Sequence, residues 1–303
     1  MPKNAIDAEA VYFVLTPEKI AEELAKITKH PEIARREIDA REPPKVENET
    51  NLQTIFVLLK ASFGVNFANY KKSTIQRRIT RRIVLSKNEN LSKYVAYLRT
   101  NKNELQALFE DLLISVTSFF REPQTFTVLK EKVFPSVIEK QVPNQPIRVW
   151  IPGCSTGEEV YSVAIAVAEF LEEKNHVDIQ IQIFGTDVNG KNVEKARRAI
   201  YPKTVEESVS ENRLNRFFTS ANGNYPIKKQ IRDMCIFAKH DLTKDPPFSN
   251  LNLIICRNLL IYFDSKLQER VARKCHHGKN KTNLTSQKIA INNLPVLNLA
   301  LTS

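Results

Sequence analysis

The sequence predicts an α/β protein in which a small helical domain precedes a parallel sheet that carries helices on both faces. From residue 147 onward, short apolar segments typical of buried strands alternate with segments of helical periodicity. This alternation is typical of a parallel sheet with crossover helices. Over residues 52–116, by contrast, apolar side chains recur at helical spacing, which indicates a domain built of helices.

The chain before this helical region has two parts. An apolar segment, Val11–Leu15, predicts a short strand, and Thr16 and Pro17 are residue types favoured at the start of a helix, which we expect to reach about Lys29. Residues 34–51 are charged, lack apolar periodicity and contain two adjacent prolines, so they predict a linker. The helical domain is expected to follow over residues 52–125.

The third helical segment of that domain is rich in arginine. The spacing of Arg77, Arg78, Arg81 and Arg82 predicts that all four share one side of a helix. A solvated basic surface is the commoner meaning of such a pattern. The alternative is a docking surface for an acidic partner.

The second half of the chain predicts strands and helices in alternation. In order, they are the strand Ile147–Ile151, the helix Glu158–Leu171, the strand Ile179–Phe184, the helix Asn192–Ala199, short strands within 217–237, the strand Leu251–Cys256 and a helix over Ser265–Lys274. After about Cys275 the chain is polar and shows no clear pattern.

The composition excludes several classes of protein. The 303 residues are 42% apolar and 26% charged, as in soluble globular proteins, and no run of about 18 apolar residues predicts a membrane span. Four cysteines without a CxxC pair and five histidines without an HExxH pattern predict neither a metal site nor disulfides and favour the cytoplasm. The net charge of +11 favours acidic partners without distinguishing nucleic acid from protein.

Polar residues follow three of the predicted strands: the loop Gly153–Glu159, Asp187, and the pair Arg257 and Asn258. Ligands of open parallel sheets bind at these carboxyl ends. Glu158 and Glu159 stand at a helix start, where they either favour the helix dipole or face a cationic ligand.

These two acids would repel the phosphates of a dinucleotide. S-adenosylmethionine brings a sulfonium, an ammonium and a ribose but no phosphate, so it suits a loop with carboxylates. Asp187 is placed to hydrogen-bond ribose hydroxyls; its alternative is to cap the following helix.

Five segments in order resemble the signatures of one family. They read VTSFFREPQTF, RVWIPGCSTGEEVYSVAI, FGTDVNGKNVEKARRAIY, AKHDL and LNLIICRNLLIYFD, within a region of resemblance that covers residues 52–272. They are similar to the CheR family of S-adenosylmethionine-dependent chemoreceptor glutamate O-methyltransferases. The resemblance implies a Rossmann-like methyltransferase domain over 126–275, with a small antiparallel insert at about 215–238 before the fourth strand. The short loop Ala221–Tyr225 resembles that of members that need no tethering peptide.

The resemblance also implies the residues that contact the cofactor. They are Ser115, Thr117, Arg121, Gly153, Glu158, Asp187, Asp241, Leu242, Arg257 and Asn258. Asp241 departs from the family, which has asparagine there. No metal is implied.

Arg121 and Tyr262 match catalytic positions of the family. A substrate glutamate is already ionised at neutral pH, so it can attack the sulfonium methyl group without a general base. Arg121 would orient the carboxylate with two hydrogen bonds, and Tyr262 would fix its other oxygen or the approach of the methyl group. The alternatives are a surface ion pair of Arg121 with Glu122 and, for Tyr262, a core aromatic with its hydroxyl at the rim.

The implied partners are the cytoplasmic helices of chemoreceptors, which would bind the arginine surface. We expect the protein to be a monomer that neither binds nucleic acid nor inserts into a membrane. Residues 1–33 resemble the end of the CheB methylesterases, so we expect a remnant of a CheB–CheR fusion. Residues 276–303 depart from the family. We therefore expect a truncated or altered tail, a sheet without its final strands and impaired activity.

Two other functions remain open from the sequence. Asp245–Phe248 reads DPPF, which resembles a motif of nucleic-acid amino-methyltransferases. That motif follows the fourth strand, whereas here it precedes the strand Leu251–Cys256. The departure at the C-terminus instead raises the alternative of a non-catalytic remnant that binds receptor or cofactor.

Overall fold

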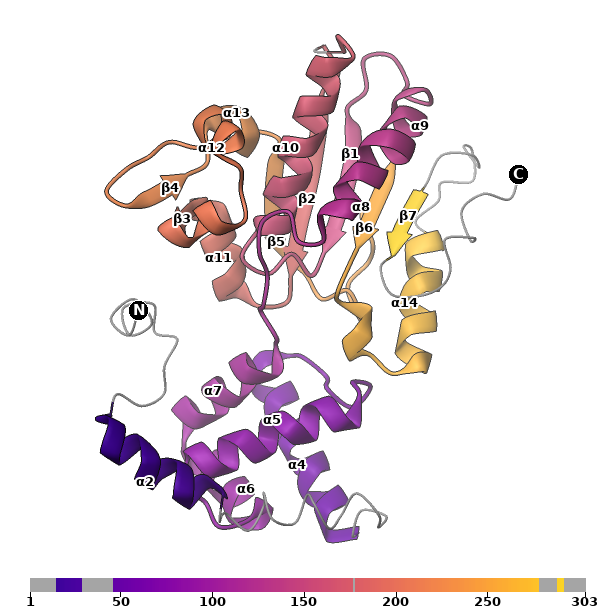
Figure 1. Cartoon of the computed structure of the whole chain (residues 1–303). Coiled ribbons are helices and arrows are strands. Elements are labelled where there is room, and N and C mark those ends of the chain that lie inside the picture. Colours follow the sequence, from indigo (N-terminus) through magenta and orange to yellow (C-terminus); the bar gives the residue numbers. More distant parts are fainter. Residues whose placement is uncertain (1–14, 29–45, 177, 278–287, 292–303) are drawn as a thin grey trace. The chain divides into compact units, whose positions relative to one another are not determined.

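The computed structural model describes residues 15–28, 46–176, 178–277 and 288–291. The chain divides into two compact units, Met1–Ile114 and Ser115–Ser303 (Figure 1). The division falls after Ile114 rather than after residue 125, because the segment from Ser115 onward makes its contacts with the sheet unit. Within the described ranges, we find no helix that is both long and apolar enough to cross a membrane.

The first unit consists of helices, as the sequence predicts. They are α2 (Pro17–Thr28), α4 (Val46–Phe63), α5 (Lys72–Leu85), α6 (Leu91–Thr100) and α7 (Lys102–Leu112). Helix α2 confirms the predicted N-terminal helix, whereas the predicted strand before it lies, except for Leu15, outside the described residues. Helix α4 begins inside residues 34–51, which we expected to be a linker; residues 34–45 of that segment lie outside the described residues.

A buried polar cluster joins α5, α6 and α7. The Arg82 guanidinium donates from Nε to Glu104 Oε1 at 2.9 Å and from Nη2 to Oε2 at 2.6 Å, and the Tyr94 hydroxyl donates to Oε1 at 2.8 Å. Although burial disfavours its charge, the hydrogen bonds to Glu104 raise the pKa of Arg82. Arg82 is therefore a fixed cation inside the unit.

The prediction that Arg82 belongs to an exposed arginine surface is wrong. Arg77 and Arg81 are exposed and Arg78 is half-buried, whereas Arg82 is only 8% exposed. Arg82 lies at the border of the apolar stripe of α5 that contains Ile79. Packing of α5 against α7 therefore buries the Arg82 side chain.

The second unit is built around a parallel sheet. Its strands are β1 (Ile147–Pro152), β2 (Ile181–Asp187), β5 (Cys235–Lys239), β6 (Leu253–Cys256) and β7 (Lys288–Ile291), in the order β5-β2-β1-β6-β7. All four neighbouring pairs are parallel. The chain turns from one half of the sheet to the other between β1 and β6, and such a switch point leaves a crevice at the carboxyl ends of the strands.

The second unit also contains helices, some of which pack on this sheet and some of which belong to the insert beside it. They are α8 (Pro123–Val128), the π-helix η1 (Leu129–Val133), α9 (Phe134–Ile138), α10 (Glu158–Glu173), α11 (Gly190–Arg198), α12 (Glu211–Phe217), α13 (Lys229–Arg232) and α14 (Ser265–His277), with short 3₁₀ turns η2 (Lys203–Glu207) and η3 (Leu260–Tyr262).

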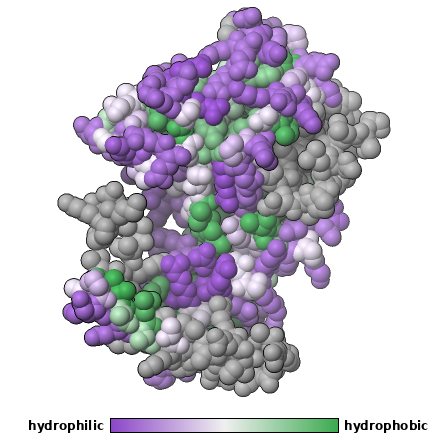
Figure 2. All heavy atoms as spheres, viewed as in Figure 1, coloured by the Kyte–Doolittle hydropathy of each residue, from purple (hydrophilic) through white to green (hydrophobic). Residues whose placement is uncertain are grey.

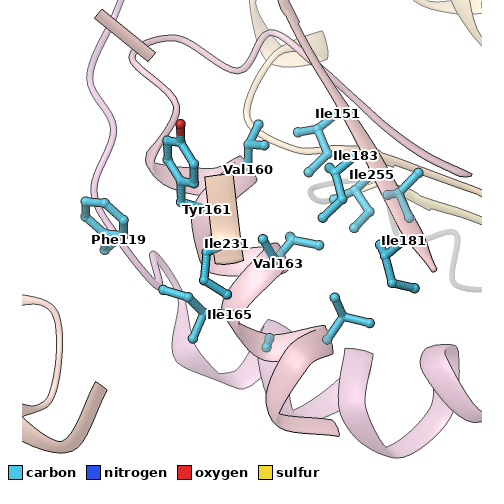
Figure 3. Close-up of a cluster of buried hydrophobic side chains, with 14 of the residues drawn as sticks. Phe119, Ile151, Val160, Tyr161, Val163, Ile165, Ile181, Ile183, Ile231 and Ile255 are labelled. Carbon is cyan, nitrogen blue, oxygen red and sulfur yellow. The ribbon is translucent and has the colours of Figure 1, made fainter. Parts of the chain in front are cut away.

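The main core lies between the sheet and α10. Figure 3 shows Val160 and Val163 of α10 in one cluster with Ile151 and Ile183 of the strands. The approach is close at Gly185, where a Cβ atom would lie 2.7 Å from the Val160 side chain. A side chain at that position would therefore push α10 away from β2.

The opposite face of the sheet carries an aromatic cluster. Trp150 is fully buried and donates from Nε1 to Thr186 Oγ1 at 3.0 Å. Phe248 stacks on Phe184 with ring centroids 5.1 Å apart and meets Trp150 edge-on at 5.4 Å. The described surface in Figure 2 is mostly hydrophilic, with apolar side chains in small groups.

The antiparallel insert differs from the expectation. Its two strands are β3 (Ile200–Pro202) and β4 (Asn224–Pro226), paired through Tyr201 and Tyr225. The insert therefore begins earlier than residue 215 and precedes the third strand of the main sheet. Strand β5, which we expected inside the insert, pairs with β2 instead, and the Arg197 guanidinium covers its outward Phe237 carbonyl at 2.8 and 3.1 Å.

The expectation that the sheet lacks its final strands is wrong for β7. The segment KIAI forms a strand parallel to β6, with Ile254 opposite Ile289. This alternating segment stands within a polar stretch, which hid it from the sequence pattern. Strand β6 is thus paired on both sides.

We expect Arg82→Ala to lower the free energy of unfolding of the helical unit by about 3–5 kcal/mol, because it leaves Glu104 as a buried carboxylate without its cation. The matched variant Arg77→Ala removes an exposed arginine from the same helix, so it should change the free energy by at most about 0.5 kcal/mol. Urea unfolding of both variants checks this. Equal effects would contradict the structural role of Arg82.

Candidate functional site

A glycine turn follows β1 at the carboxyl edge of the sheet. Gly153 and Gly157 have φ angles of +72° and +98°, and Ser155 between them has +50°. Both glycines lie in the left-handed region that side chains disfavour. A Cβ atom at Gly157 would also lie 2.8 Å from the Ala196 Cβ and 3.0 Å from the Tyr201 hydroxyl. The turn is therefore packed closely against α11 and β3.

Asp187 ties this turn to the end of β2. Its Oδ2 accepts from the Ser155 amide at 2.9 Å and its Oδ1 from the Asn189 amide at 2.7 Å. The helix cap that we considered for Asp187 is wrong, because Asn189 caps α11 by accepting from the Lys191 amide. Burial raises the pKa of Asp187, and the backbone amides partly oppose this. The carboxylate is fixed beside the turn and poorly hydrated.

Two further acids begin α10. Thr156 Oγ1 donates to Glu158 at 2.9 and 2.7 Å, and Glu159 Oε1 lies 3.3 Å from Arg257 Nη1. Burial raises the pKa of both carboxyls; the Thr156 hydrogen bond opposes this at Glu158 and the Arg257 charge at Glu159. Acids at a helix start interact favourably with the helix dipole, but that interaction does not require them to be desolvated. Together with Asp187, these desolvated carboxylates favour the binding of a cation.

Arg257 follows β6 and gathers several chain segments. Its side chain is 2% exposed, and Nη2 donates to the Arg121 carbonyl at 2.8 Å. The Glu122 carboxylate lies 3.3 Å from the same nitrogen. The neighbouring Asn258, with φ +53°, donates from Nδ2 to Glu122 at 3.4 Å. The structure thus brings the predicted pair Arg257 and Asn258 to the loop of Arg121.

Arg121 stands between two strained residues of that loop. Phe120 and Glu122 have φ angles of +48° and +58°, and the Phe120 amide donates to Ser162 Oγ of α10 at 2.9 Å. The half-buried Arg121 donates from Nη1 to the Val116 carbonyl at 3.1 Å. Glu122, the partner in the alternative for Arg121, contacts Arg257 and Asn258.

The start of the same segment is joined to the turn and to α11. The Ser115 carbonyl accepts from Ser155 Oγ at 3.2 Å, and the Ser115 hydroxyl accepts from Asn192 Nδ2 at 2.8 Å. Thr117 is half-buried nearby in sequence, and Tyr262 is half-buried in η3 after β6. This half-buried position is compatible both with the catalytic role of Tyr262 and with its alternative, a core aromatic whose hydroxyl lies at the rim.

Asp241 and Leu242 are both buried in the loop after β5. Asp241 Oδ1 accepts from the Thr243 amide at 2.9 Å and hydroxyl at 2.6 Å, and the Leu242 carbonyl accepts from Lys274 at 3.3 Å. In the DPPF segment, Asp245 Oδ2 accepts from the Asp241 amide at 2.7 Å. With Phe248 in the aromatic cluster, DPPF is a structural turn before β6 and lends no support to a nucleic-acid enzyme.

The sequence missed several residues of this site. Glu122, Ser155, Thr156 and Asn189 hold the predicted residues in place, yet none was a candidate. Glu159 was considered with Glu158 as an acid that could face a cationic ligand, but it was not among the residues that the family resemblance implies. The one signal that points to them is their position inside the FFRE, CSTGEE and GTDVN segments.

Comparison with known proteins agrees with this geometry. Residues 50–113 match the all-alpha domain of CheR methyltransferase, and residues 115–284 match its SAM-binding domain. The chain belongs to the CheR methyltransferase family. It is therefore a methyltransferase whose cofactor is S-adenosylmethionine.

Individual relatives share about a third of their residues with this chain over the matched regions. The chain is 38% identical over 246 residues to a 104.1 kDa protein of the hypE 3' region of Rhodobacter capsulatus, covering 81% of this chain and 25% of that protein. It is 30% identical to the chemotaxis protein methyltransferase of Borreliella burgdorferi, over 74% of this chain and 81% of that protein. It is 32% identical to chemotaxis protein methyltransferase 2 of Vibrio cholerae, over 66% and 71%. The chain thus spans a quarter of the first relative and most of the other two.

The residues present fit S-adenosylmethionine. Three desolvated carboxylates, Glu158, Glu159 and Asp187, suit a ligand with two cationic groups and no phosphate. Two buried atoms of the site, Arg257 Nε and Asn258 Oδ1, have no hydrogen-bond partner within the described part of the chain. Unpaired buried polar atoms in a native site indicate a missing partner.

We expect Gly157→Ala to lower the free energy of unfolding of the sheet unit by more than Gly223→Ala does. Both positions have positive φ, at +98° and +75°, so each variant carries strain of about 1–3 kcal/mol. Only at position 157 does the new Cβ atom also meet Ala196 at 2.8 Å, whereas at 223 it meets nothing within 4 Å. Thermal unfolding of the two variants checks this; equal losses would show that the close contact is unimportant.

We expect S-adenosylmethionine to release protons when it binds at mildly acidic pH. Because burial raises the pKa of Glu158, Glu159 and Asp187, the folded protein holds protons there above the ordinary carboxylate range. A bound cation lowers these pKa values again. Affinity should therefore rise as pH rises from that range through the raised pKa values, and level off above them. Calorimetry in two buffers of different ionisation enthalpy measures the protons released; identical heats would contradict this.

Proposed function

We propose that the protein transfers the methyl group of S-adenosylmethionine to glutamate side chains of chemoreceptors. The observation that supports this most strongly is that Arg257 contacts both the loop of Arg121 and the acids at the start of α10. Its guanidinium bonds the Arg121 carbonyl at 2.8 Å and Glu159 at 3.3 Å. The arginine suited to a substrate carboxylate is thereby linked to the acids suited to the cofactor. The relatives named chemotaxis protein methyltransferases support this reaction.

The chemistry asks little of the protein. Bound S-adenosylmethionine supplies a methyl group on a positively charged sulfur. The substrate carboxylate is ionised at neutral pH, so no side chain needs to remove a proton. Alignment of the two groups and exclusion of water are then the main contributions to rate.

Arg121 is the residue that we assign to the substrate carboxylate. One of its N–H groups is held by the Val116 carbonyl, and the planar guanidinium has further donors for a two-pronged contact. The Tyr262 hydroxyl would hold the other side of the carboxylate or the path of the methyl group. Both roles are catalytic because both groups would touch the reacting atoms.

The other site residues are assigned to the cofactor. Glu158 would face its ammonium group, Asp187 the ribose hydroxyls, and Asp241 with Leu242 the adenine. Ser115, Thr117, Gly153, Arg257 and Asn258 would line the remainder. An aspartate in place of the family's asparagine at 241 can only accept hydrogen bonds, which suits the exocyclic amino group of adenine.

Exposed cations of α5 are proposed to attract the acidic receptor helices. Arg77 and Arg81 are exposed and Arg78 is half-buried, so these three remain from the predicted surface without Arg82. We also propose a cytoplasmic monomer. The four cysteines, all in described parts of the chain, are free thiols, as expected in a reducing compartment.

The N-terminal resemblance leads to a separate proposal. We infer that residues 1–33 derive from a methylesterase joined to the methyltransferase. The long relative from Rhodobacter capsulatus, matched over 25% of its length, is an example of a larger chain that contains a region similar to this one.

We expect the purified chain to transfer label from radioactive S-adenosylmethionine to receptor-containing membranes as base-labile methyl esters. Label in DNA alone would contradict the proposal. Binding of cofactor without any transfer would favour the non-catalytic alternative.

Within this assay, Arg121→Ala should lower kcat/KM for receptor by about 100-fold, as expected when a substrate is misplaced. Tyr262→Phe should cost about tenfold, the loss of one hydrogen bond to the reacting groups. Lys132→Ala removes an exposed cation of the same unit and should leave the rate unchanged. A normal rate for Arg121→Ala would contradict its assignment.

A further inference from the structure

Glu122 has an unusual backbone conformation for a residue that precedes a proline. It lies in the left-handed region, with φ 58° and ψ 74°, directly before Pro123. Residues before proline normally have an extended backbone. Glu122 also occupies the N-cap position of α8, yet its side chain makes no cap hydrogen bond. Helix capping therefore does not account for an acid at this strained position.

The carboxylate instead reaches the end of β6, far away in the sequence. Oε2 lies 3.3 Å from Arg257 Nη2, and Oε1 accepts from Asn258 Nδ2 at 3.4 Å, a long hydrogen bond. Glu159 also lies 3.3 Å from Arg257, so Glu122 is not needed to balance the charge of that arginine. The distinctive contact of Glu122 is therefore its hydrogen bond with the Asn258 amide.

This contact determines which end of the amide faces which way. A carboxylate has acceptors only, so the amide must present Nδ2 to Glu122. Oδ1 then lies on the other side of the group, where it is buried and has no hydrogen-bond partner among the described residues. The left-handed backbone of Asn258, φ +53°, holds the side chain at this place. A buried acceptor without a donor indicates a partner that binds there.

We propose that Glu122 is a positioning residue, which fixes the Asn258 amide so that Oδ1 is offered to an N–H donor of S-adenosylmethionine. This deepens the proposed function and rests on it. The cofactor carries an ammonium group, which an amide oxygen can accept from. Its carboxylate would need the amide turned round. Glu122 thus sets the polarity of one cofactor contact without touching the cofactor.

Three variants separate this role from simple stabilisation. In Glu122→Gln the new side chain can accept or donate, so the Asn258 amide is no longer fixed. In Asn258→Asp two carboxylates face each other, and their repulsion turns the new side chain away from the position where it could accept from the cofactor. In the double variant, the amide introduced at position 122 can donate to one oxygen of the carboxylate introduced at position 258, and the other oxygen is again an acceptor for the cofactor. The double variant should therefore recover what each single change loses.

The first measurement is calorimetry with S-adenosylhomocysteine, which keeps the ammonium group and needs no receptor. We expect each single variant to raise Kd by about tenfold, the loss of one hydrogen bond, and the double variant to return to within about threefold of the original protein. The control Glu139→Gln changes an exposed glutamate of the same unit and should leave Kd unchanged. The second measurement is Tm without ligand, which Asn258→Asp should lower and the double variant restore.

The outcomes are distinguishable. A Kd for the double variant that equals the combined single losses, or singles within about twofold of the original, would overturn the positioning role while cofactor binding by the original protein stands. Failure of the original protein to bind S-adenosylhomocysteine would overturn the proposed function and the cofactor contact with it. The Tm coupling would then still show whether Glu122 fixes the amide.

Discussion

The site depends on one buried guanidinium. Arg257 stands at the end of β6 and bonds the first turn of α10 through Glu159 and the loop of Arg121 through the Arg121 carbonyl. Taking an arginine out of water is costly unless its hydrogen bonds are well made. The segments that meet it are therefore held where they are by the need to pair that charge. Phe126 also lies beside it, with its ring centroid 5.7 Å from the guanidinium carbon.

The pairing also explains how the site tolerates strained backbone. Phe120, Glu122, Ser155 and Asn258 have φ angles of 48°, 58°, 50° and 53°, and none is glycine. Each such residue costs about 1–3 kcal/mol and persists only where its surroundings fix it. Arg257 bonds the loop between Phe120 and Glu122, and the Asp187 carboxylate bonds the Ser155 amide. Strain is thus concentrated around Arg121, the residue that we propose for the substrate carboxylate, and such fixed geometry is a form of preorganisation.

The sequence predicted the repeating parts and missed what long-range packing decides. Strand β1, helix α10 and strand β2 follow from periodicity, and the acids at the start of α10 follow from their place in the loop. Strand β5 was misassigned because a short apolar segment pairs equally well with a hairpin neighbour or with β2, and only the fold selects β2. Arg82 lies at the border of an apolar stripe, where packing alone decides burial. Glu122 stands beside Arg121 in sequence, yet its partners lie 135 and 136 residues away.

The preference of the site for a cationic ligand depends on the burial of its acids rather than on how many there are. Glu158 and Glu159 on a solvated helix would contribute only a small dipole term. Desolvation raises the pKa of both, and of Asp187, so each ionised form is held at a cost. A cationic ligand relieves that cost, whereas a phosphate would add to it. Because Asp187 is bonded to two backbone amides, its carboxylate is kept at the glycine turn. The same fold that elsewhere accepts pyrophosphate at this edge is thereby restricted to a cofactor with positive charge.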